Sequence, residues 1–564
     1  MSPQRAIPRQ QVLPIPPPPF PQNDPHVNHG AVFTRRWVVE FILDTVRFDP
    51  SEDLASKLLV EPACGDGAFL LPIAERVIES CRQHGRPLTE AADAVRAFDL
   101  QAQHVDRSRR LLSALFSESG LDDDAARGLA EAWVSHSDFL LLPHEEETAD
   151  FVVGNPPYIR LEDVPAERMA AYKHTCTTMS GRADIYLGFF ETGLRLLAKE
   201  GMLGFICADR WMRNAYGKHL RQLVIAGYSV EATVEMHDAE AFADAVAAYP
   251  AVTVIRRGTQ ASALVATTTS AFDGEAAAAV VHWARRHDEA GSTASLRGGT
   301  KVARLPGWFE TDSSWPTGSP QRLTLLRELE DRLRPLESGS TRVGIGVATG
   351  ADAVFVTDDP LVVEEDRLIP LAMTRDTTSG LLNWGGKYLV NPWAGPRQLV
   401  DLAEYPGLKR YLGRHEAALR RRHVAGRRPE QWYRTIDPVH PRLTPKRKLL
   451  FPDMKMFAHP VLDPGGHYPH HNLYYVVSEE WDLGVLGGLL MSKVAQFFIE
   501  AYAVRMRGGT LRFQAQYLRR IHVPEVESLS NEQRCVLRQA FADRDVESAT
   551  QVALEAYGLE RPPD

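Results

Sequence analysis

The four residues Asn155-Pro156-Pro157-Tyr158 could hold a planar amino group and make it nucleophilic. The two prolines fix two backbone φ angles and remove two N–H donors, so the asparagine side chain and the nearby carbonyls point in fixed directions. The Asn155 amide oxygen and the Pro156 carbonyl could accept both hydrogens of an exocyclic NH2, while Tyr158 offers a face for the ring that carries it. A strand-ending turn without any chemistry would use the same residues.

The segment before this motif predicts the element that positions it. Residues 150–154 form a short apolar run, which is typical of a strand buried on both faces, and the run ends abruptly at Asn155. Open α/β sheets bind their ligands at the carboxyl ends of their strands. We therefore expect Asn155 to lie at a ligand-binding edge of a sheet.

An earlier stretch predicts a nucleotide-binding unit. The apolar residues 58–60 lead through Glu61-Pro62-Ala63-Cys64 into a turn with Gly65 and Gly67 and then into a helix. Glycine lets the backbone approach a ligand closely, and acidic residues beside it suit a cationic or hydroxyl-bearing group. The third glycine of a dinucleotide fingerprint is missing and no Walker motif is present, so a purely structural turn is an equal alternative.

Two further strands would deliver side chains to the same edge. Residues 94–98 are followed by Asp99, a carboxylate that could bind a ribose diol. Residues 137–140, Ser-Asp-Phe-Leu, belong to a third short element. Thr34 precedes an amphipathic run at 37–43 and could cap that helix.

The alternation of strands and helices predicts the fold class. Between residues 30 and 256 it indicates an α/β doubly wound sheet, with further strands at 201–207, 230–235 and 251–256 and a helix at 184–197. Residues 160–182 are polar and irregular, which suggests a lid or a substrate loop. Short glycine-punctuated strands follow residue 260. We predict a proline-rich disordered leader at 1–29, the α/β domain at 30–265, a mixed α/β or β-rich domain at 266–527 and a helical tail at 528–564.

Composition limits the class of protein. Hydrophobic residues make up 44% and charged residues 24% of 564 residues, as in ordinary globular proteins. No apolar run approaches a membrane span and no signal-peptide core is present, which predicts a cytoplasmic protein without a membrane partner. The five cysteines form no CxxC pair, so neither structural zinc nor disulfides are expected. Residues 467–471 contain three histidines without partners at ligand spacing, and we predict a surface loop and no metal there.

Positive charge is concentrated in one window of the second half. Residues 401–450 contain thirteen Lys or Arg against five Asp or Glu, a balance of +8, whereas the rest of the chain carries −17. A cationic patch on an acidic body suggests that a polyanion docks at one place. The arginines of this window include Arg420, Arg421, Arg422, Arg427 and Arg428, and a glycine-containing loop near the end of the chain adds Arg505, Arg507 and Arg512.

The ordered set of motifs resembles the gamma-class adenine-N6 DNA methyltransferases of restriction-modification systems, in particular their TaqI-type and Eco57I-type groups. The set consists of residues 61–70, Asp99, residues 137–139 and residues 155–158 in that order. The likeness covers roughly residues 30–260, and residues 344–356 and 483–524 resemble the target-recognition half of the same proteins. The resemblance implies a class I methyltransferase (Rossmann-like) domain followed by a target-recognition domain. In the second domain, the arginines of the basic window would contact phosphates, and Arg505, Arg507 and Arg512 would contact base edges.

The resemblance also implies site residues. Asn155, Pro156 and Tyr158 would receive the target adenine, and Phe242 would stack on its other face, although Tyr249 competes for that role. Asp99 would hold the ribose of S-adenosylmethionine. The remaining cofactor contacts would be Thr34, Glu61, Pro62, Ala63, Cys64, Gly65, Gly67, Asp138, Phe139 and Pro157. The chain departs from the pattern at Asp66, where Ser is common, at Arg35, where Pro is common, and at Gln101, where an acidic residue is usual.

The function implied by this resemblance is methyl transfer from S-adenosylmethionine to adenine N6 of a base flipped out of double-stranded DNA. Such a protein would be the modification component of a restriction-modification or related anti-phage system, working as a monomer beside a separately encoded restriction endonuclease. An RNA methyltransferase and a protein-glutamine methyltransferase would share the same motif. A fused protein that also cuts DNA and a non-catalytic DNA-binding protein are further alternatives. Residues 452–455 lack the acidic neighbour of a nuclease metal site, and both candidate motifs are intact.

Overall fold

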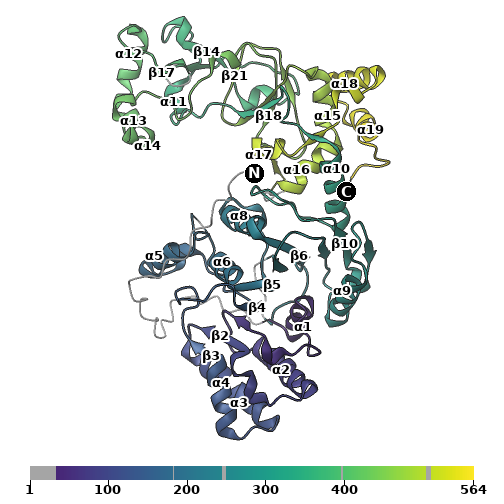
Figure 1. The fold of residues 1–564 in the computed structure, drawn as a ribbon. Helices are drawn as coiled ribbons and strands as arrows, with labels where there is room; N and C mark the ends of the chain where they lie inside the picture. The colour runs from purple at the N-terminus through teal and green to yellow at the C-terminus, as the bar shows by residue number, and fades with distance from the viewer. Residues whose placement is uncertain (1–33, 182, 244–248, 396–397, 504–509, 564) are drawn as a thin grey trace. The chain divides into compact units, whose positions relative to one another are not determined.

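The computed structural model describes residues 34–181, 183–243, 249–395, 398–503 and 510–563. The chain forms two compact units, Met1–Thr324 and Leu325–Asp564 (Figure 1). The predicted leader at 1–29 lies outside the described residues. Helix α10, Pro320–Arg332, runs across the division.

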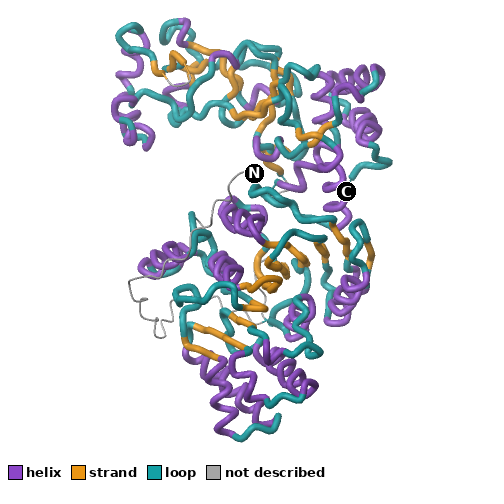
Figure 2. The backbone as a smooth tube through the Cα atoms, viewed as in Figure 1, coloured by secondary structure: helices purple, strands orange, loops and turns teal. Residues whose placement is uncertain are grey.

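The first unit is built on one ten-stranded sheet with the order β3-β2-β1-β4-β5-β7-β6-β8-β10-β9. Helices lie on both faces of this sheet, which confirms the predicted doubly wound α/β class (Figure 2). The strands are β1 (Leu59–Glu61), β2 (Val95–Asp99), β3 (Val134–His136), β4 (Ala149–Gly154), β5 (Leu197–Ala208), β6 (Tyr228–Glu235), β7 (Pro250–Arg257), β8 (Ala263–Thr267), β9 (Thr293–Ser295) and β10 (Lys301–Leu305).

Strand direction fixes where a ligand can bind. Strands β3, β2, β1, β4 and β5 are all parallel, whereas β7 runs antiparallel between β5 and β6. The chain builds outward from β1 to β2 and β3, and then returns to place β4 on the other side of β1. The carboxyl ends of β1 and β4 therefore form the topological switch point, where open α/β sheets leave a crevice.

Two groups of helices cover the sheet. One continuous core holds buried side chains from the strands and from α1, α2, α3, α4 and α9. On the other face, the ring of Phe190 from α6 packs against the ring of Phe205 from β5, with centroids 5.1 Å apart. Helix α8 contacts α6 on this face. The helices of this unit are α1 (Arg36–Thr45), α2 (Leu70–His84), α3 (Ala102–Glu118), α4 (Asp123–Trp133), α5 (Ala166–Thr175), α6 (Tyr186–Leu196), α7 (Arg210–Arg213), α8 (Lys218–Gly227) and α9 (Gly274–Arg286).

The segment 160–182, expected to be irregular, contains helix α5. Its buried side chains are Arg168 and Tyr172 rather than an apolar stripe, so the segment lacks the periodicity by which helices are recognised. Polar contacts of these two side chains hold the helix in place.

The first unit extends beyond the boundary predicted at residue 265. Strand β8 pairs in parallel with β6, and β10 then pairs antiparallel with β8, so both continue the same sheet. Four of the five residues of β8 are buried. The predicted boundary is wrong by about sixty residues because short strands at the edge of a large sheet resemble the start of a new domain.

The second unit is a mixed α/β structure. Its two four-stranded sheets have the orders β12-β22-β18-β20 and β13-β15-β14-β21. The strands are β11 (Arg334–Pro335), β12 (Arg342–Ile345), β13 (Val356–Thr357), β14 (Leu368–Ala372), β15 (Tyr388–Val390), β16 (Trp393–Gly395), β17 (Gln398–Leu399), β18 (Lys448–Pro452), β19 (Met454–Lys455), β20 (Val461–Asp463), β21 (Tyr468–Pro469), β22 (Leu473–Val477), β23 (Leu511–Arg512) and β24 (His522–Val523).

The helices of the second unit include the predicted C-terminal helical segment. They are α11 (Asp352–Phe355), α12 (Pro406–Arg414), α13 (Glu416–Arg420), α14 (His423–Arg427), α15 (Leu483–Met491), α16 (Lys493–Tyr502), α17 (Ala515–Leu518), α18 (Asn531–Asp543) and α19 (Val546–Tyr557). Helices α18 and α19 pack against α15, so they belong to the second unit and are not a separate tail.

Among the described residues, no single helix is long and apolar enough to cross a membrane. Helices α15 and α16 reach that length and composition only as a pair, which bends by 63° where they meet.

Candidate active site

A pocket of about 890 Å³, including space open to solvent, lies where β1, β2 and β4 end. It is at the switch point of the sheet, as the strand order requires. Ten of the eleven residues predicted to contact a cofactor line it: Thr34, Glu61, Pro62, Ala63, Cys64, Gly65, Asp99, Asp138, Phe139 and Pro157. Asn155 lines the same pocket. The exception is Gly67.

Gly67 shapes the turn and does not line the pocket. Its φ of +94° is one that other residues rarely adopt, and a Cβ there would lie 3.3 Å from the Ser108 hydroxyl of α3. The glycine therefore lets α3 approach the turn closely. Its role is to set the path of the backbone around the pocket.

Asp99 is fixed by backbone donors on both of its oxygens. The N–H of Gly65 donates to Oδ2 at 2.9 Å, and the N–H of Gln101 donates to Oδ1 at 2.8 Å. His104 Nδ1 lies 3.4 Å from Oδ1, and the proximity of the Asp99 carboxylate raises the pKa of His104 above its ordinary value. Through these two bonds, the Asp99 side chain links the turn that follows β1 to the turn that follows β2, and it lines the pocket.

Glu61 is a buried carboxylate that lacks a complete set of partners. It is 1% exposed, and its Oε2 has no hydrogen-bond partner among the described residues. Burial, followed by the nearby charge of Asp99, raises the pKa of Glu61 well above its ordinary value. An unpaired buried carboxylate that lines a pocket fits a ligand carrying a positive charge.

Asp138 is held by helix α5. The Tyr172 hydroxyl donates to Oδ2 at 2.8 Å, and Arg168 Nε lies 3.6 Å from the same oxygen. The backbone N–H of Leu140 donates to Oδ1 at 3.1 Å. Burial raises the pKa of Asp138, and Arg168 opposes that rise. Helix α5 therefore closes one side of the pocket through a buried polar contact.

Aromatic side chains form an apolar wall beside Asp138. The Phe139 ring stacks on that of Phe189 from α6, with centroids 5.7 Å apart and planes at 17°. Phe189 and Tyr172 both line the pocket, yet the sequence did not single them out. Each lies in a helix, where an aromatic residue normally indicates core packing, so the sequence carried no distinguishing signal.

Thr34 meets Asn155 instead of capping α1. The N-cap position belongs to Arg35, which makes no side-chain cap hydrogen bond. The Asn155 Nδ2 amide donates to the Thr34 hydroxyl at 3.2 Å. This bond orients the asparagine amide at the edge of the pocket.

Tyr158 and Phe242 lie together beside the asparagine. Their ring centroids are 6.3 Å apart and the planes meet at 79°. Thr34 forms an isolated β-bridge with Phe242. This bridge brings the Phe242 ring close to residues 155–158. The competing residue Tyr249 lies against His237 and Arg210. Pro156, Tyr158 and Phe242 are not among the residues that line the pocket.

Comparison with known proteins identifies the family. The family model "Eco57I restriction-modification methylase" matches residues 93–242. The type II methyltransferase M.XhoI of Xanthomonas vasicola is 42% identical over 94% of this chain and 97% of its own length. M.PaeR7I of Pseudomonas aeruginosa is 41% identical over 94% and 92%, and M.BstVI of Geobacillus stearothermophilus is 36% identical over 94% and 96%.

The chain is a type II methyltransferase of the Eco57I restriction-modification family. The predicted resemblance is confirmed, and the methyltransferase is a DNA-modifying component of a restriction-modification system. The RNA and protein-glutamine alternatives have no support among these relatives.

The arginines predicted to contact DNA differ in their surroundings in this methyltransferase. Arg422 donates to the carbonyls of Thr349, Trp432 and Arg434 at 2.7 to 3.0 Å, and burial lowers its pKa. Its guanidinium is therefore committed to internal contacts.

The other predicted arginines that the structure describes are more accessible. Arg420 pairs with Glu416 at 2.7 Å, and Arg512 pairs with Asp453. Arg421, Arg427 and Arg428 are exposed and form no ion pair with the described residues. Arg505 and Arg507 lie outside the described residues.

Proposed function

We propose that this methyltransferase transfers the methyl group of S-adenosylmethionine to N6 of an adenine flipped out of double-stranded DNA. One observation carries the proposal. The Asn155 amide lies at the edge of the pocket that the β1 turn, Asp99 and Asp138 enclose, and the paired rings of Tyr158 and Phe242 lie beside it.

The pocket fits S-adenosylmethionine by its chemistry. The unpaired buried carboxylate of Glu61 suits the α-ammonium group, and Asp99 suits the ribose hydroxyls. Phe139 and Phe189 offer an apolar wall to the adenine ring, and Asp138 lies beside them. The bound cofactor supplies a methyl group already activated by a sulfonium. The residues of the chain therefore need to position the two reactants.

Asn155 and Pro156 would hold the amino group of the target base. Their oxygens accept its two hydrogens, which keeps the nitrogen lone pair out of the ring and directs it toward the methyl group. Thr34 fixes the amide by accepting from its Nδ2, so the amide oxygen is the atom turned to the substrate. The nitrogen becomes acidic only after attack, so the motif needs no general base in the first step.

A base inside duplex DNA cannot reach this asparagine. The adenine must leave the stack at a cost of a few kcal/mol. Stacking on Tyr158 and Phe242 would offset part of that cost, at about 1–3 kcal/mol per base. We further propose that the protein acts in the cytoplasm as a monomer and that a separate polypeptide supplies the restriction endonuclease.

Substitution of Asn155 tests the proposal directly. Asn155→Ala should reduce N6-methyladenine formation below detection while DNA binding persists, measured by mass spectrometry of digested DNA and by a gel-shift assay. Asn383→Ala, which removes an exposed asparagine, is the matched control and should keep full activity. Methylation by Asn155→Ala at the unmodified rate, or a product on cytosine, would refute the proposal.

A further inference from the structure

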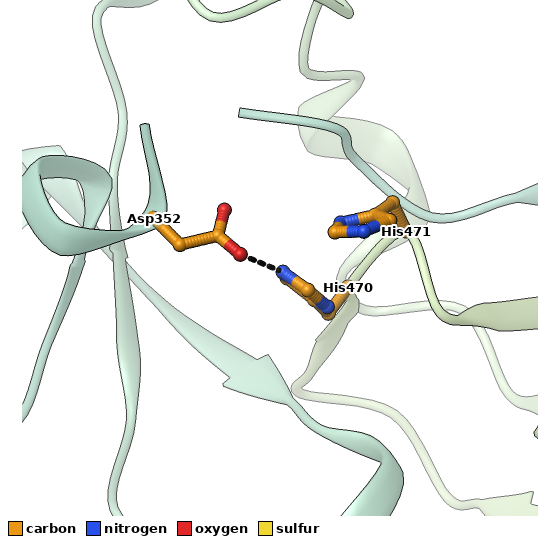
Figure 3. A group of neighbouring side chains, drawn as sticks. All are labelled: Asp352, His470 and His471. Atoms are coloured by element: carbon orange, nitrogen blue, oxygen red, sulfur yellow. Dashed lines mark hydrogen bonds and ion pairs between the residues drawn. The ribbon is translucent and has the colours of Figure 1, made fainter. Parts of the chain in front are cut away.

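Three metal-binding side chains converge in the second unit. Asp352 begins α11, and His470 and His471 lie between β21 and β22. One ligand atom from each residue lies within 4.8 Å of the others, and the carboxylate faces the two imidazole rings (Figure 3). The predicted surface loop is wrong for His470, which is 2% exposed.

The spacing of the first two ligands suits a small divalent cation. His470 Nε2 lies 3.0 Å from Asp352 Oδ2. Two ligands held tetrahedrally about 2.0–2.1 Å from zinc are roughly 3.3 Å apart, so a cation would need only a slight opening of this contact. The Thr349 hydroxyl donates to the other carboxylate oxygen and orients the group.

The two imidazole rings lie side by side at the candidate site. Their Nδ1 atoms are both buried and have no hydrogen-bond partner among the described residues. The ring centroids are 4.1 Å apart. A ring nitrogen that carries no proton offers the lone pair that a metal requires.

We propose that Asp352, His470 and His471 form a binding site for one zinc-class divalent cation. Two nitrogens and one carboxylate oxygen match the ligand preference of zinc and cobalt, and three protein ligands leave one coordination position for water or another ligand. The side chain of Asp352 is 47% exposed, so the open position is accessible to solvent. His467, the third histidine of the loop, pairs with Asp463 and takes no part.

The cation would join two segments that are distant in sequence. The residues of the Asp352–His470 pair are 118 positions apart. Backbone hydrogen bonds of Val347 already connect the two segments. Its N–H donates to the Pro469 carbonyl at 2.9 Å, and its carbonyl accepts from the His471 N–H at 3.0 Å. A metal bound beside this bridge would stabilise the folded second unit by mass action, because the unfolded chain does not hold the three ligands together.

Metal titration of the whole protein tests this site. After treatment with EDTA, the protein should bind one equivalent of Zn²⁺ by calorimetry, its Tm should rise with Zn²⁺ concentration, and Co²⁺ should give visible absorption bands of a four-coordinate complex. Asp352→Asn and His471→Ala should each weaken Zn²⁺ binding at least tenfold. His423→Ala removes an exposed histidine of the same unit and should bind as the unmodified protein does.

These variants keep the test independent of folding. Both altered residues are partly exposed, so the metal-free Tm of each variant should stay close to that of the unmodified protein. Failure of the unmodified protein to bind Zn²⁺ at micromolar concentration would overturn the proposal. Equal Zn²⁺ affinity in the unmodified protein, Asp352→Asn and His471→Ala would overturn it as well.

Discussion

The ring of Phe242 meets the ring of Tyr158 edge to face, with centroids 6.3 Å apart and planes at 79°. This is a favourable arrangement for two aromatic rings in direct contact. A base stacked between them would need parallel faces about 7 Å apart, because each stacked contact takes about 3.5 Å. The Tyr158 hydroxyl is anchored on the Ile206 carbonyl at 3.3 Å, so Phe242 is the ring expected to turn.

We predict that Phe242→Ala lowers methylation of a normally paired target by about 5-fold to 150-fold, the loss that corresponds to roughly 1–3 kcal/mol of stacking. The loss should be smaller when the target adenine is mismatched, since less energy is then needed to extrude it. Single-turnover rates on the two substrates measure this difference.

Tyr249→Ala is the control for the aromatic role. Tyr249 is 53% exposed and contacts Arg210 and His237, so its loss should leave both rates nearly unchanged. Equal losses on paired and mismatched targets in Phe242→Ala, accompanied by a lower Tm, would mean that Phe242 acts in core packing instead.

The raised pKa of Glu61 predicts how cofactor binding depends on pH. Burial is the main cause of the rise, and it keeps the carboxyl protonated at pH values where an exposed glutamate is ionised. A cationic ammonium binds the ionised form. Affinity for S-adenosylmethionine should therefore increase as pH rises through the raised pKa, and calorimetry across pH 5–9 would measure it. Glu61→Gln should bind more weakly and lose this dependence.

The same group makes an opposite contribution to stability. Because its folded pKa lies above its unfolded value, Glu61 contributes stability that is fully present below the unfolded pKa of about 4.5 and is lost as pH rises through the folded pKa. Urea unfolding without cofactor should show this loss in the unmodified protein and not in Glu61→Gln. Glu118→Gln, an exposed change, should follow the unmodified protein in both measurements.

The sequence predicted the elements that have strong local signals. The apolar run before Asn155 and the glycine turn after Glu61 correspond to β4 and to the β1 turn, and their residues line one pocket. The partner of Thr34 was not predictable, because a threonine before a helix indicates a cap while its actual contact, Asn155, lies 121 residues later. A local sequence pattern does not indicate contacts between residues that are far apart in the chain.

Long-range pairing also explains the other differences. Tyr172 and Arg168 hold α5 through Asp138, so the helix has no apolar stripe to reveal it. His470 acquires its carboxylate neighbour from a segment 118 residues away, and the histidine-rich loop alone shows only nitrogen ligands. Strands β8 and β10 belong to the large sheet because they pair with β6 and with each other. The sequence of a short strand does not indicate which strand it pairs with, so the domain boundary was placed too early.

The surroundings of the arginines separate a DNA-binding role from a structural one. Arg421, Arg427 and Arg428 are exposed and without ion pairs among the described residues, so each is free to contact phosphate. We predict that changing all three to Gln weakens DNA binding and reduces the slope of log K against log salt by up to about 3, since each phosphate contact contributes about 0.9. Fluorescence anisotropy at several salt concentrations measures this slope.

Arg422→Gln should behave differently, although it also removes an arginine charge from the same window. Its guanidinium donates to four backbone carbonyls, those of residues 349, 419, 432 and 434, so loss of these bonds should lower the Tm of the second unit. The salt slope should stay unchanged, as it should in Arg127→Gln, whose arginine is paired with Asp124 on α4. A reduced slope in Arg422→Gln at an unchanged Tm would show instead that Arg422 leaves its carbonyls to bind phosphate.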